Sequence, residues 1–202
     1  MILLQILIRH LYFMENIKKQ FDLIHPLKDE SWNALKKELN LVRYKRKTAI
    51  TSKGEIERYL YIVKSGIQRG FYVKDHKEIT IVFTHSHSFS GIPESMFRKE
   101  ASKYYLETLT ESELYRIPYE KIQMLSEKYN DIDKLMHISC MQGFLGLHER
   151  LFDLQALNAE ERFVSFMKRS AYLINEIPHK YIASYLHMSP ATFSKLLHQV
   201  NY

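Results

Sequence analysis

The chain has 202 residues, of which 46% are apolar, 13% aromatic and 26% charged. This composition excludes collagen, a disordered tail protein and a disulfide-stapled miniprotein, and the length allows one large domain or two small ones. The formal net charge of +6 favours an anionic partner such as nucleic acid or acidic lipid. Most of the excess lies in residues 14–117, notably at residues 43–47, so charge alone does not locate a DNA-reading segment.

The single cysteine limits both compartment and cofactors. Cys140 cannot form an internal disulfide, and alone it cannot supply the thiolates of a structural zinc site or an iron–sulfur cluster. We therefore expect a cytoplasmic protein, and the sequence identifies no cofactor and no effector. The apolar opening is interrupted by Arg9 and His10, well short of the roughly 20 residues that span a bilayer, and it lacks the features of a signal peptide. Residues 1–13 are interpreted as an apolar N-terminal extension or an additional packing turn, with no membrane partner.

Periodicity divides the chain into three parts. Between residues 17 and 41 apolar positions recur every three or four residues, which predicts two short helices separated by Pro26. Six short runs rich in Tyr, Ile, Val, Phe and Thr then predict strands, with turn signals at 52–54, 64–66 and 75–76. These runs are residues 41–47, 59–63, 67–73, 79–84, 104–109 and 113–117. Closely spaced short strands of this kind predict a β-sandwich or roll.

A helical period returns after Pro118 and predicts one long helix from about residue 131 to 157. Gly143 and Gly146 are poor helix formers, so their presence indicates close approach by a neighbouring backbone. The apolar stripe of this helix either packs on its own domain or pairs with the same helix of a second chain. For the second case we expect a homodimer whose interface includes Met136, Cys140, Gly143, Leu147 and Leu154.

The last third of the chain predicts a helix-turn-helix. Asn158 followed by two glutamates is typical of a helix start. Residues 178–200 then carry two apolar stripes with a break at residues 187–189, where Ser189 is placed to cap the second helix and Pro190 to begin it. The small Ala183 allows the two helices to cross closely. Ordinary helical hairpins share this spacing.

Charge in this segment favours DNA binding, because no carboxylate follows Glu176. In a helix-turn-helix the N-terminal half of the second helix faces base edges in the major groove. The predicted contacts to double-stranded DNA are Ser189, Pro190, Ala191, Thr192, Ser194 and Lys195, with Lys180 from the first helix. These first positions hold no Arg, Asn or Gln, so we expect modest base reading per subunit, which a symmetric dimer would reinforce.

The order of these parts, with the motifs at residues 182–186 and 188–195, resembles the Crp/Fnr transcription regulators. The resemblance implies an α+β fold with an N-terminal antiparallel β-roll of the cyclic nucleotide-binding type, a long dimerisation helix and a C-terminal winged-helix domain. It also makes RNA polymerase a candidate partner. The expected boundaries are 1–13 for the extension, 14–118 for the roll, 119–157 for the connection and dimerisation helix, and 158–202 for the DNA-binding domain. A wing would have to come from residues before Pro178.

The effector site departs from this resemblance. In members that bind cyclic AMP, a Gly-Glu pair grips the ribose, and an Arg-Ser or Arg-Thr pair about ten residues later neutralises the phosphate. Gly91 retains the glycine, but Ile92 replaces the glutamate, and Ser102 and Lys103 stand where Arg-Ser is expected. Isoleucine cannot accept a hydrogen bond and the bidentate phosphate fork is lost. We therefore expect no high-affinity binding of cyclic AMP, although Lys103 with nearby basic residues could hold another anion.

Two alternatives stay open. One is a regulator whose roll serves only as a dimerisation scaffold. The other is a metal-binding β-roll enzyme with a helical appendage, because His85 and His87 would point to the same side of a strand. Glu94 lies too far along the chain to complete a cupin-type site, so a loop pair is favoured. With no paired acids, no Ser-His-Asp order and no phosphate loop, we expect no enzymatic activity.

Overall fold

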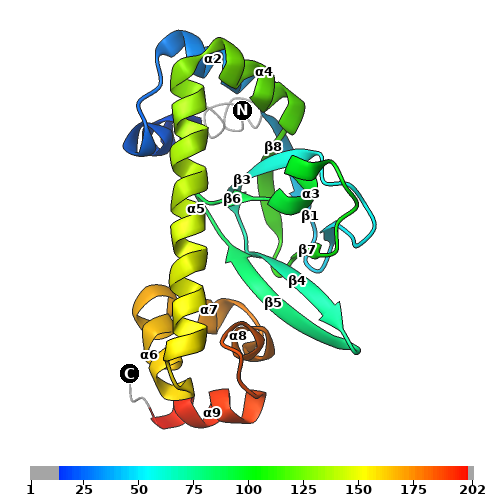
Figure 1. Ribbon diagram of the computed structural model, residues 1–202, viewed down its shortest axis with the longest axis vertical. Helices are drawn as coiled ribbons and strands as arrows, with labels where there is room; N and C mark the ends of the chain where they lie inside the picture. The colour runs from blue at the N-terminus through cyan, green and yellow to red at the C-terminus, as the bar shows by residue number, and fades with distance from the viewer. Residues whose placement is uncertain (1–13, 200–202) are drawn as a thin grey trace, which may run out of the picture.

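The computed structural model describes residues 14–199, so the predicted extension at 1–13 lies outside the described residues. Within that range the chain has an α+β fold in which two four-stranded antiparallel sheets form a roll. Helices lie above and below the roll, and one long helix runs along its side from the first group of helices to the last (Figure 1). The expected fold class is therefore confirmed.

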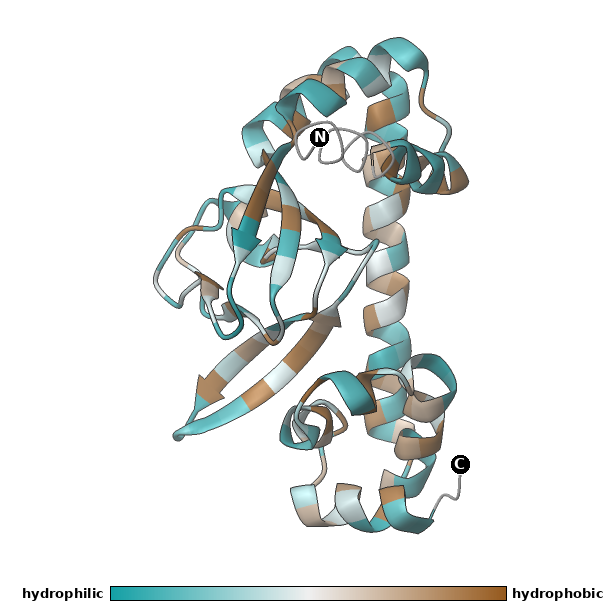
Figure 2. Cartoon of the chain, turned by 180° about the vertical axis from the view of Figure 1, so that it is seen from behind, coloured by the Kyte–Doolittle hydropathy of each residue, from teal (hydrophilic) through white to brown (hydrophobic). Residues whose placement is uncertain are grey.

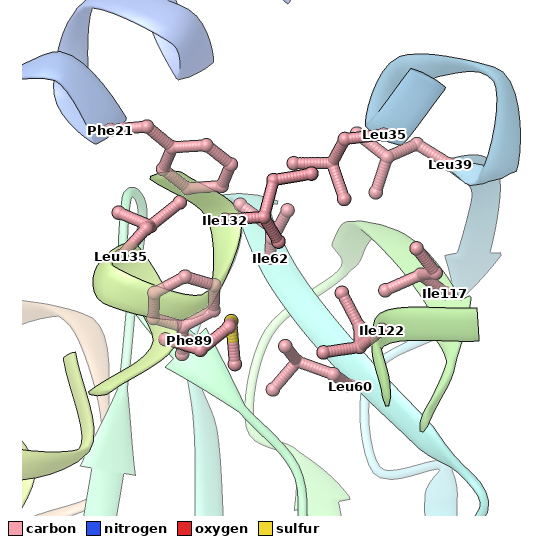
Figure 3. Close-up of a pocket in the computed structure, with 11 residues that line it drawn as sticks. Phe21, Leu35, Leu39, Leu60, Ile62, Phe89, Ile117, Ile122, Ile132 and Leu135 are labelled. Atoms are coloured by element: carbon pink, nitrogen blue, oxygen red, sulfur yellow. The ribbon is translucent and has the colours of Figure 1, made fainter. Parts of the chain in front are cut away.

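The N-terminal helices pack on one end of the roll. Residues 14–24 are helical and α2 (Asp29–Glu38) follows Pro26, which confirms the two predicted helices. Together with α4 (Tyr119–Lys128) and the start of the long helix they cover apolar residues of the roll. Their side chains converge from separate elements on a cavity of about 10 Å³ with apolar walls (Figure 3). A space this small with apolar walls belongs to the core.

The six predicted strands are all present as β1 (Asn40–Tyr44), β3 (Tyr59–Ser65), β4 (Gln68–Lys74), β5 (Lys77–Thr84), β7 (Tyr105–Thr108) and β8 (Ser112–Pro118). One sheet has the order β1-β8-β3-β6 and the other β2-β7-β4-β5. The strands β2 (Ala49–Thr51) and β6 (Phe89–Ser90) and the helix α3 (Pro93–Arg98) were not predicted. Elements of two to six residues are too short to show a period.

Two turns explain why the strands end where they do. Asp75 and His76 have φ of 49° and 61°, the left-handed pair that a tight two-residue hairpin requires between β4 and β5. Gly66 has φ of 88°, and a Cβ there would stand 2.4 Å from the carbonyl oxygen of Glu111. Only glycine fits that position, which confirms the turn signal at residues 64–66.

The long helix α5 (Asn130–Ala156) matches the predicted one to within a residue. At 1.5 Å per residue its 27 residues span about 40 Å. Ile132 and Leu135 are fully buried at its start, whereas every residue from Met141 to Glu149 is exposed. Hydrophobic residues recur along this uncovered middle section (Figure 2).

Four helices complete the described chain, namely α6 (Ala159–Ser170), α7 (Leu173–Glu176), α8 (His179–Tyr185) and α9 (Pro190–Gln199). Asn158 caps α6 in a capping box with Glu161, which confirms the predicted helix start. Pro178 occupies the N-cap of α8. Residues 158–199 contain helices and no strand, so the winged form implied by the resemblance is not found in the described residues. The strand that lies on α8 is β5 of the roll.

The roll and the C-terminal helices share one apolar core. Ile67 and Leu109, both from the roll, are buried together with residues of α6, α8 and α9 such as Phe163, Ile182 and Phe193. A buried apolar junction of this kind disfavours free motion between the two parts. None of the helices within residues 14–199 combines the length and hydropathy needed to cross a membrane.

Candidate nucleic-acid interface and effector site

The predicted helix-turn-helix is formed by α8 and α9. Ala183 and Phe193 are both fully buried where the two helices meet. The ring of Phe193 packs edge-on against Phe163 of α6, with 5.5 Å between ring centroids. The backbone N–H of Met188 donates to the carbonyl of Ala183 at 3.0 Å, which closes the turn. The small residue therefore permits the close crossing that the sequence predicted.

The start of α9 is capped as expected. The backbone N–H of Thr192 donates to Ser189 Oγ at 3.0 Å, and Pro190 is the first helical residue. The hydroxyl groups of Ser189 and Thr192 lie 2.8 Å apart, so both predicted contacts share their hydrogen-bonding capacity with the cap. Of the predicted base-reading positions, Ala191, Ser194 and Lys195 are exposed and Thr192 is half-buried.

The exposed face of α9 extends beyond the predicted residues. His198 and Gln199 are exposed one turn after Ser194 and Lys195. On α8, Lys180 is exposed, and its ammonium lies 4.9 Å from the ring centroid of Tyr181. Most of the predicted contacts are therefore accessible, and α8 and α9 themselves hold no acidic residue.

The turn between the two helices is held by a residue that the sequence did not single out. Arg162 of α6 donates from Nε to the carbonyl of Leu186 at 2.9 Å and from Nη1 to the carbonyl of Leu157 at 2.6 Å. His187 in this turn has a positive φ of 54°. A guanidinium at the carboxyl end of a helix neutralises its free carbonyl groups. Because those partners are backbone atoms, no sequence pattern reveals the role of Arg162.

The middle of α5 presents an apolar seam to solvent. Its members are Cys140, Phe144, Leu147 and Leu151, spaced four, three and four residues apart, and all are exposed. Gly143 lies beside them with open space at its Cβ position. The other predicted interface residues, Met136 and Leu154, are half-buried, and Met136 packs on the N-terminal core. The predicted stripe thus divides between the core and this seam.

The predicted effector residues lie around α3. Gly91 has φ of 139°, and a Cβ there would meet the carbonyl oxygen of Tyr59 at 3.3 Å, so glycine is favoured. Ile92 is buried and forms the N-cap of α3. Lys103 lies in the loop after α3 and is exposed, and its ammonium is 3.7 Å from the carboxylate of Glu94 on α3. Its charge is therefore partly satisfied by the protein itself.

The side chain of Ser102 is hydrogen-bonded to the backbone. Its side chain is buried, its hydroxyl donates to the carbonyl of Tyr104 at 2.9 Å, and the N–H of Tyr104 donates back to the same oxygen at 2.9 Å. The main chain of Ser102 also pairs with that of Gly54 and Glu55 at 2.8 Å. These bonds stabilise the loop and leave the hydroxyl little capacity for a ligand.

A buried carboxyl lies beside this loop and was missed by the sequence reasoning. Glu57 is only 3% exposed, its carboxyl accepts from Thr51 Oγ1 at 2.5 Å and from the N–H of Tyr59 at 3.0 Å, and its N–H donates to Ser95 of α3. Burial raises the pKa of Glu57 above the ordinary value, against the lowering effect of these hydrogen bonds. A buried acid beside the loop that holds Ser102 disfavours the binding of a phosphate group there.

We expect Glu57→Gln to stabilise the protein more at pH 8 than at pH 4. A carboxyl whose pKa is raised on folding binds its proton more tightly in the native state, so stability falls as pH rises from the unfolded toward the folded pKa. The amide removes that penalty, its oxygen can still accept from the N–H of Tyr59, and its NH2 group can donate to Thr51 Oγ1. Thermal unfolding of both proteins across this range measures the difference, and an equal gain at both ends would contradict the assignment.

His85 and His87 lie in the turn between β5 and β6 and not on a strand. The ring of His85 packs edge-on against Tyr172, and His87 has a positive φ of 73°. Among the described residues no group of three or more His, Cys, Asp or Glu side chains could hold a metal ion. The geometry of this pair gives the metal-enzyme alternative no support.

Comparison with known proteins agrees with this architecture. Residues 41–129 match the model of the cyclic nucleotide-binding domain. The fold is similar to that of FixK2 from Bradyrhizobium japonicum, with a TM-score of 0.70 and 15% identity over 80% of this chain and 83% of that one. No curated protein matches the sequence.

Two further structures share the fold. One is a protein from Eubacterium rectale assigned to the Crp/Fnr family of transcriptional regulators, with a TM-score of 0.66 and 18% identity over 86% of this chain and 83% of that one. The other is the c-di-GMP-responsive global regulator CLP of Xanthomonas campestris, with a TM-score of 0.63 and 19% identity over 85% of this chain and 91% of that one. Residues 41–129 therefore resemble the cyclic nucleotide-binding domain, and the fold of the chain is similar to that of these regulators.

Proposed function

We propose that the protein is a bacterial, cytoplasmic transcription regulator of the Crp/Fnr type that binds double-stranded DNA through α9. The observation that carries this proposal is the capped helix α9, which buries Phe193 against the domain, exposes Ala191, Ser194 and Lys195, and holds no acidic residue. Lys195 pairs with a guanine or a phosphate, and Ser194 donates or accepts. The proposed DNA-binding domain comprises residues 158–202, with RNA polymerase as a candidate partner.

The proposal includes a homodimer formed through residues 119–157. The α5 seam of Cys140, Phe144, Leu147 and Leu151 exposes large apolar side chains over several turns, and isolated chains rarely leave such a surface uncovered. Paired α5 helices would bury it, and the open space at Gly143 would let the backbones approach. Two copies of α9 would then read two half-sites about one helical turn apart.

We further propose that the roll, residues 14–118, does not respond to cyclic AMP. Ile92 has no acceptor for a ribose hydroxyl, the Ser102 hydroxyl is hydrogen-bonded to the backbone, and none of Ile92, Ser102 and the buried Glu57 supplies a cation for a phosphate. These observations also favour the second candidate function, in which the roll is a dimerisation scaffold without a ligand.

Titration calorimetry with cyclic AMP tests the effector prediction. We expect no heat of binding up to millimolar nucleotide, because the groups that would neutralise the phosphate are replaced or already paired. Sub-micromolar binding of cyclic AMP would contradict it.

DNA binding is tested by a mobility-shift assay with the promoter next to the protein's own coding region. We expect Lys195→Ala to lower specific affinity by at least about tenfold, because each subunit loses one contact worth about 1–3 kcal/mol. Lys168→Ala, an exposed lysine in the last turn of α6, is the matched control and should bind normally. If Lys195→Ala and Thr192→Ala both leave specific binding intact, α9 is not the recognition helix.

A further inference from the structure

Helix α8 is fastened to the roll by a cluster of polar contacts, which we call the hairpin clasp. Its members are Arg69, Glu78 and Thr80 of the β4–β5 hairpin, Arg150 of α5 and Ser184 of α8. The hairpin reaches down from the roll to lie beside α8 (Figure 1). No exposed residue of α9 takes part in the clasp.

Ser184 ties α8 to a strand edge. β5 is the last strand of its sheet, so one side of its backbone lacks a strand partner. The N–H of Thr80 donates to Ser184 Oγ at 3.0 Å, and the Ser184 hydroxyl donates to the carbonyl of Glu78 at 3.1 Å. A single hydroxyl thus satisfies one donor and one acceptor of the edge, which fixes α8 at one position along β5.

Arg69 contributes ion pairs and contacts with aromatic rings to the clasp. Its side chain is 1% exposed, and its guanidinium lies 4.0 Å from the ring centroid of Phe71 and 3.7 Å from that of Tyr181 on α8. It forms ion pairs with Glu78 and with Glu107, the latter at 2.5 Å. A buried cation that is fully paired and stacked on an aromatic ring of α8 holds that ring in one orientation.

Arg150 connects the same point to the long helix. Its Nη2 donates to the carbonyl of Tyr185 at 2.9 Å and to that of Thr80 at 3.3 Å, and its guanidinium lies 3.6 Å from the ring centroid of Tyr185. Strand β5, helix α8 and helix α5 therefore meet through one side chain. The angle between α8 and α5 is fixed by these contacts and by the shared core.

We infer that Arg69 and Ser184 are positioning residues that set the distance between the two DNA half-sites which the protein reads. The inference rests on the proposed function, because α5 pairs the two subunits and α8 carries α9. Arg69 and Ser184 hold α8 on β5, and Arg150 joins both to α5, so these contacts together set the separation and tilt of the two α9 helices. The clasp should leave the sequence of each half-site unchanged, since Ala191, Ser194 and Lys195 lie outside it.

The test begins with the full chain and selection from random-sequence duplexes, which should yield a palindrome with one spacing. Fluorescence anisotropy then compares that duplex with duplexes whose spacer is longer or shorter by a base pair. For Ser184→Ala we expect the preference for the selected spacer to fall at least about fivefold, because both hydrogen bonds of this hydroxyl to β5 are lost, with the half-site sequence unchanged. Ser184→Thr keeps the hydroxyl and should restore the preference.

Arg69→Met should relax the spacer preference further, and circular dichroism shows whether this buried change still folds. Ser170→Ala, at the end of α6, is the control and should keep the wild-type preference. A folded Ser184→Ala protein with an unchanged spacer preference, or with affinity lowered equally for all spacers, would overturn the inference. A wild-type chain that selects no sequence would instead contradict the proposed function.

Discussion

Leu147→Glu on α5 is expected to convert the protein to a monomer and to lower its affinity for a palindromic site about 100-fold or more. Leu147 is 55% exposed in the single chain and lies in the middle of the apolar α5 seam. In a paired seam the carboxylate would lose its water without gaining a cation. A monomer also loses the linkage between two half-sites, which contributes about 10²- to 10⁴-fold in affinity. Light scattering measures the mass and anisotropy measures the affinity.

The matched control for this experiment is Met124→Glu on α4. Met124 is 60% exposed, as apolar and as accessible as Leu147, but it lies outside the seam. This variant should keep the mass and the DNA affinity of the wild type. A Leu147→Glu protein that retains the wild-type mass would show that the subunits do not meet through the α5 seam.

Phe193→Ala is expected to cost about 3–5 kcal/mol of unfolding free energy, the usual cost of removing a fully buried aromatic side chain. The ring has no exposed surface, and its centroid lies 5.5 Å from that of Phe163 and 5.3 Å from that of His179. Because Ile67 and Leu109 of the roll share this core, we expect one cooperative transition in which the roll is destabilised as well. Urea unfolding followed by circular dichroism measures the change.

Phe97→Ala on α3 is the control for that loss. Phe97 is 47% exposed and should cost about 1 kcal/mol or less. Equal costs for the two substitutions would contradict the packing of α9. Two separated transitions in the wild-type protein would contradict the shared core.

Local patterns in the sequence predicted much of the fold. The strands carry runs of β-branched and aromatic residues, and the hairpin at Asp75 and His76 follows from turn residues that tolerate positive φ. The caps of α6 and α9 follow from Asn158 and Ser189, whose side chains bind backbone N–H groups a few residues away. These features were predictable because each depends on neighbours in sequence.

The parts that were missed depend on contacts between residues far apart in the chain. From the sequence, Glu57 in a charged loop would be expected to face solvent. Its burial results from contacts with Thr51, Tyr59 and Ser95, which come from separate parts of the chain. The absence of strands among residues 158–199 was likewise not predicted, and the strand that packs on α8 is β5 of the roll, far away in the sequence. Burial of Arg69 between Phe71 and Tyr181 likewise joins strand β4 to helix α8.

The division of the predicted α5 stripe has the same origin. Met136 and Cys140 are four residues apart and share the helical period, yet one packs on the N-terminal core and the other is exposed. Periodicity identifies a face of a helix but not the element that covers it. The position of the seam therefore required the arrangement of the roll against α5.

Methylation interference on the selected duplex tests the central claim most directly, since N7 of guanine is accessible in the major groove. If α9 reads DNA as a dimer, premethylated guanines should interfere in two clusters about one helical turn apart, and Lys195→Ala should remove the interference of one guanine in each cluster. Interference that is absent, evenly distributed or unchanged in Lys195→Ala would contradict recognition of the major groove by α9.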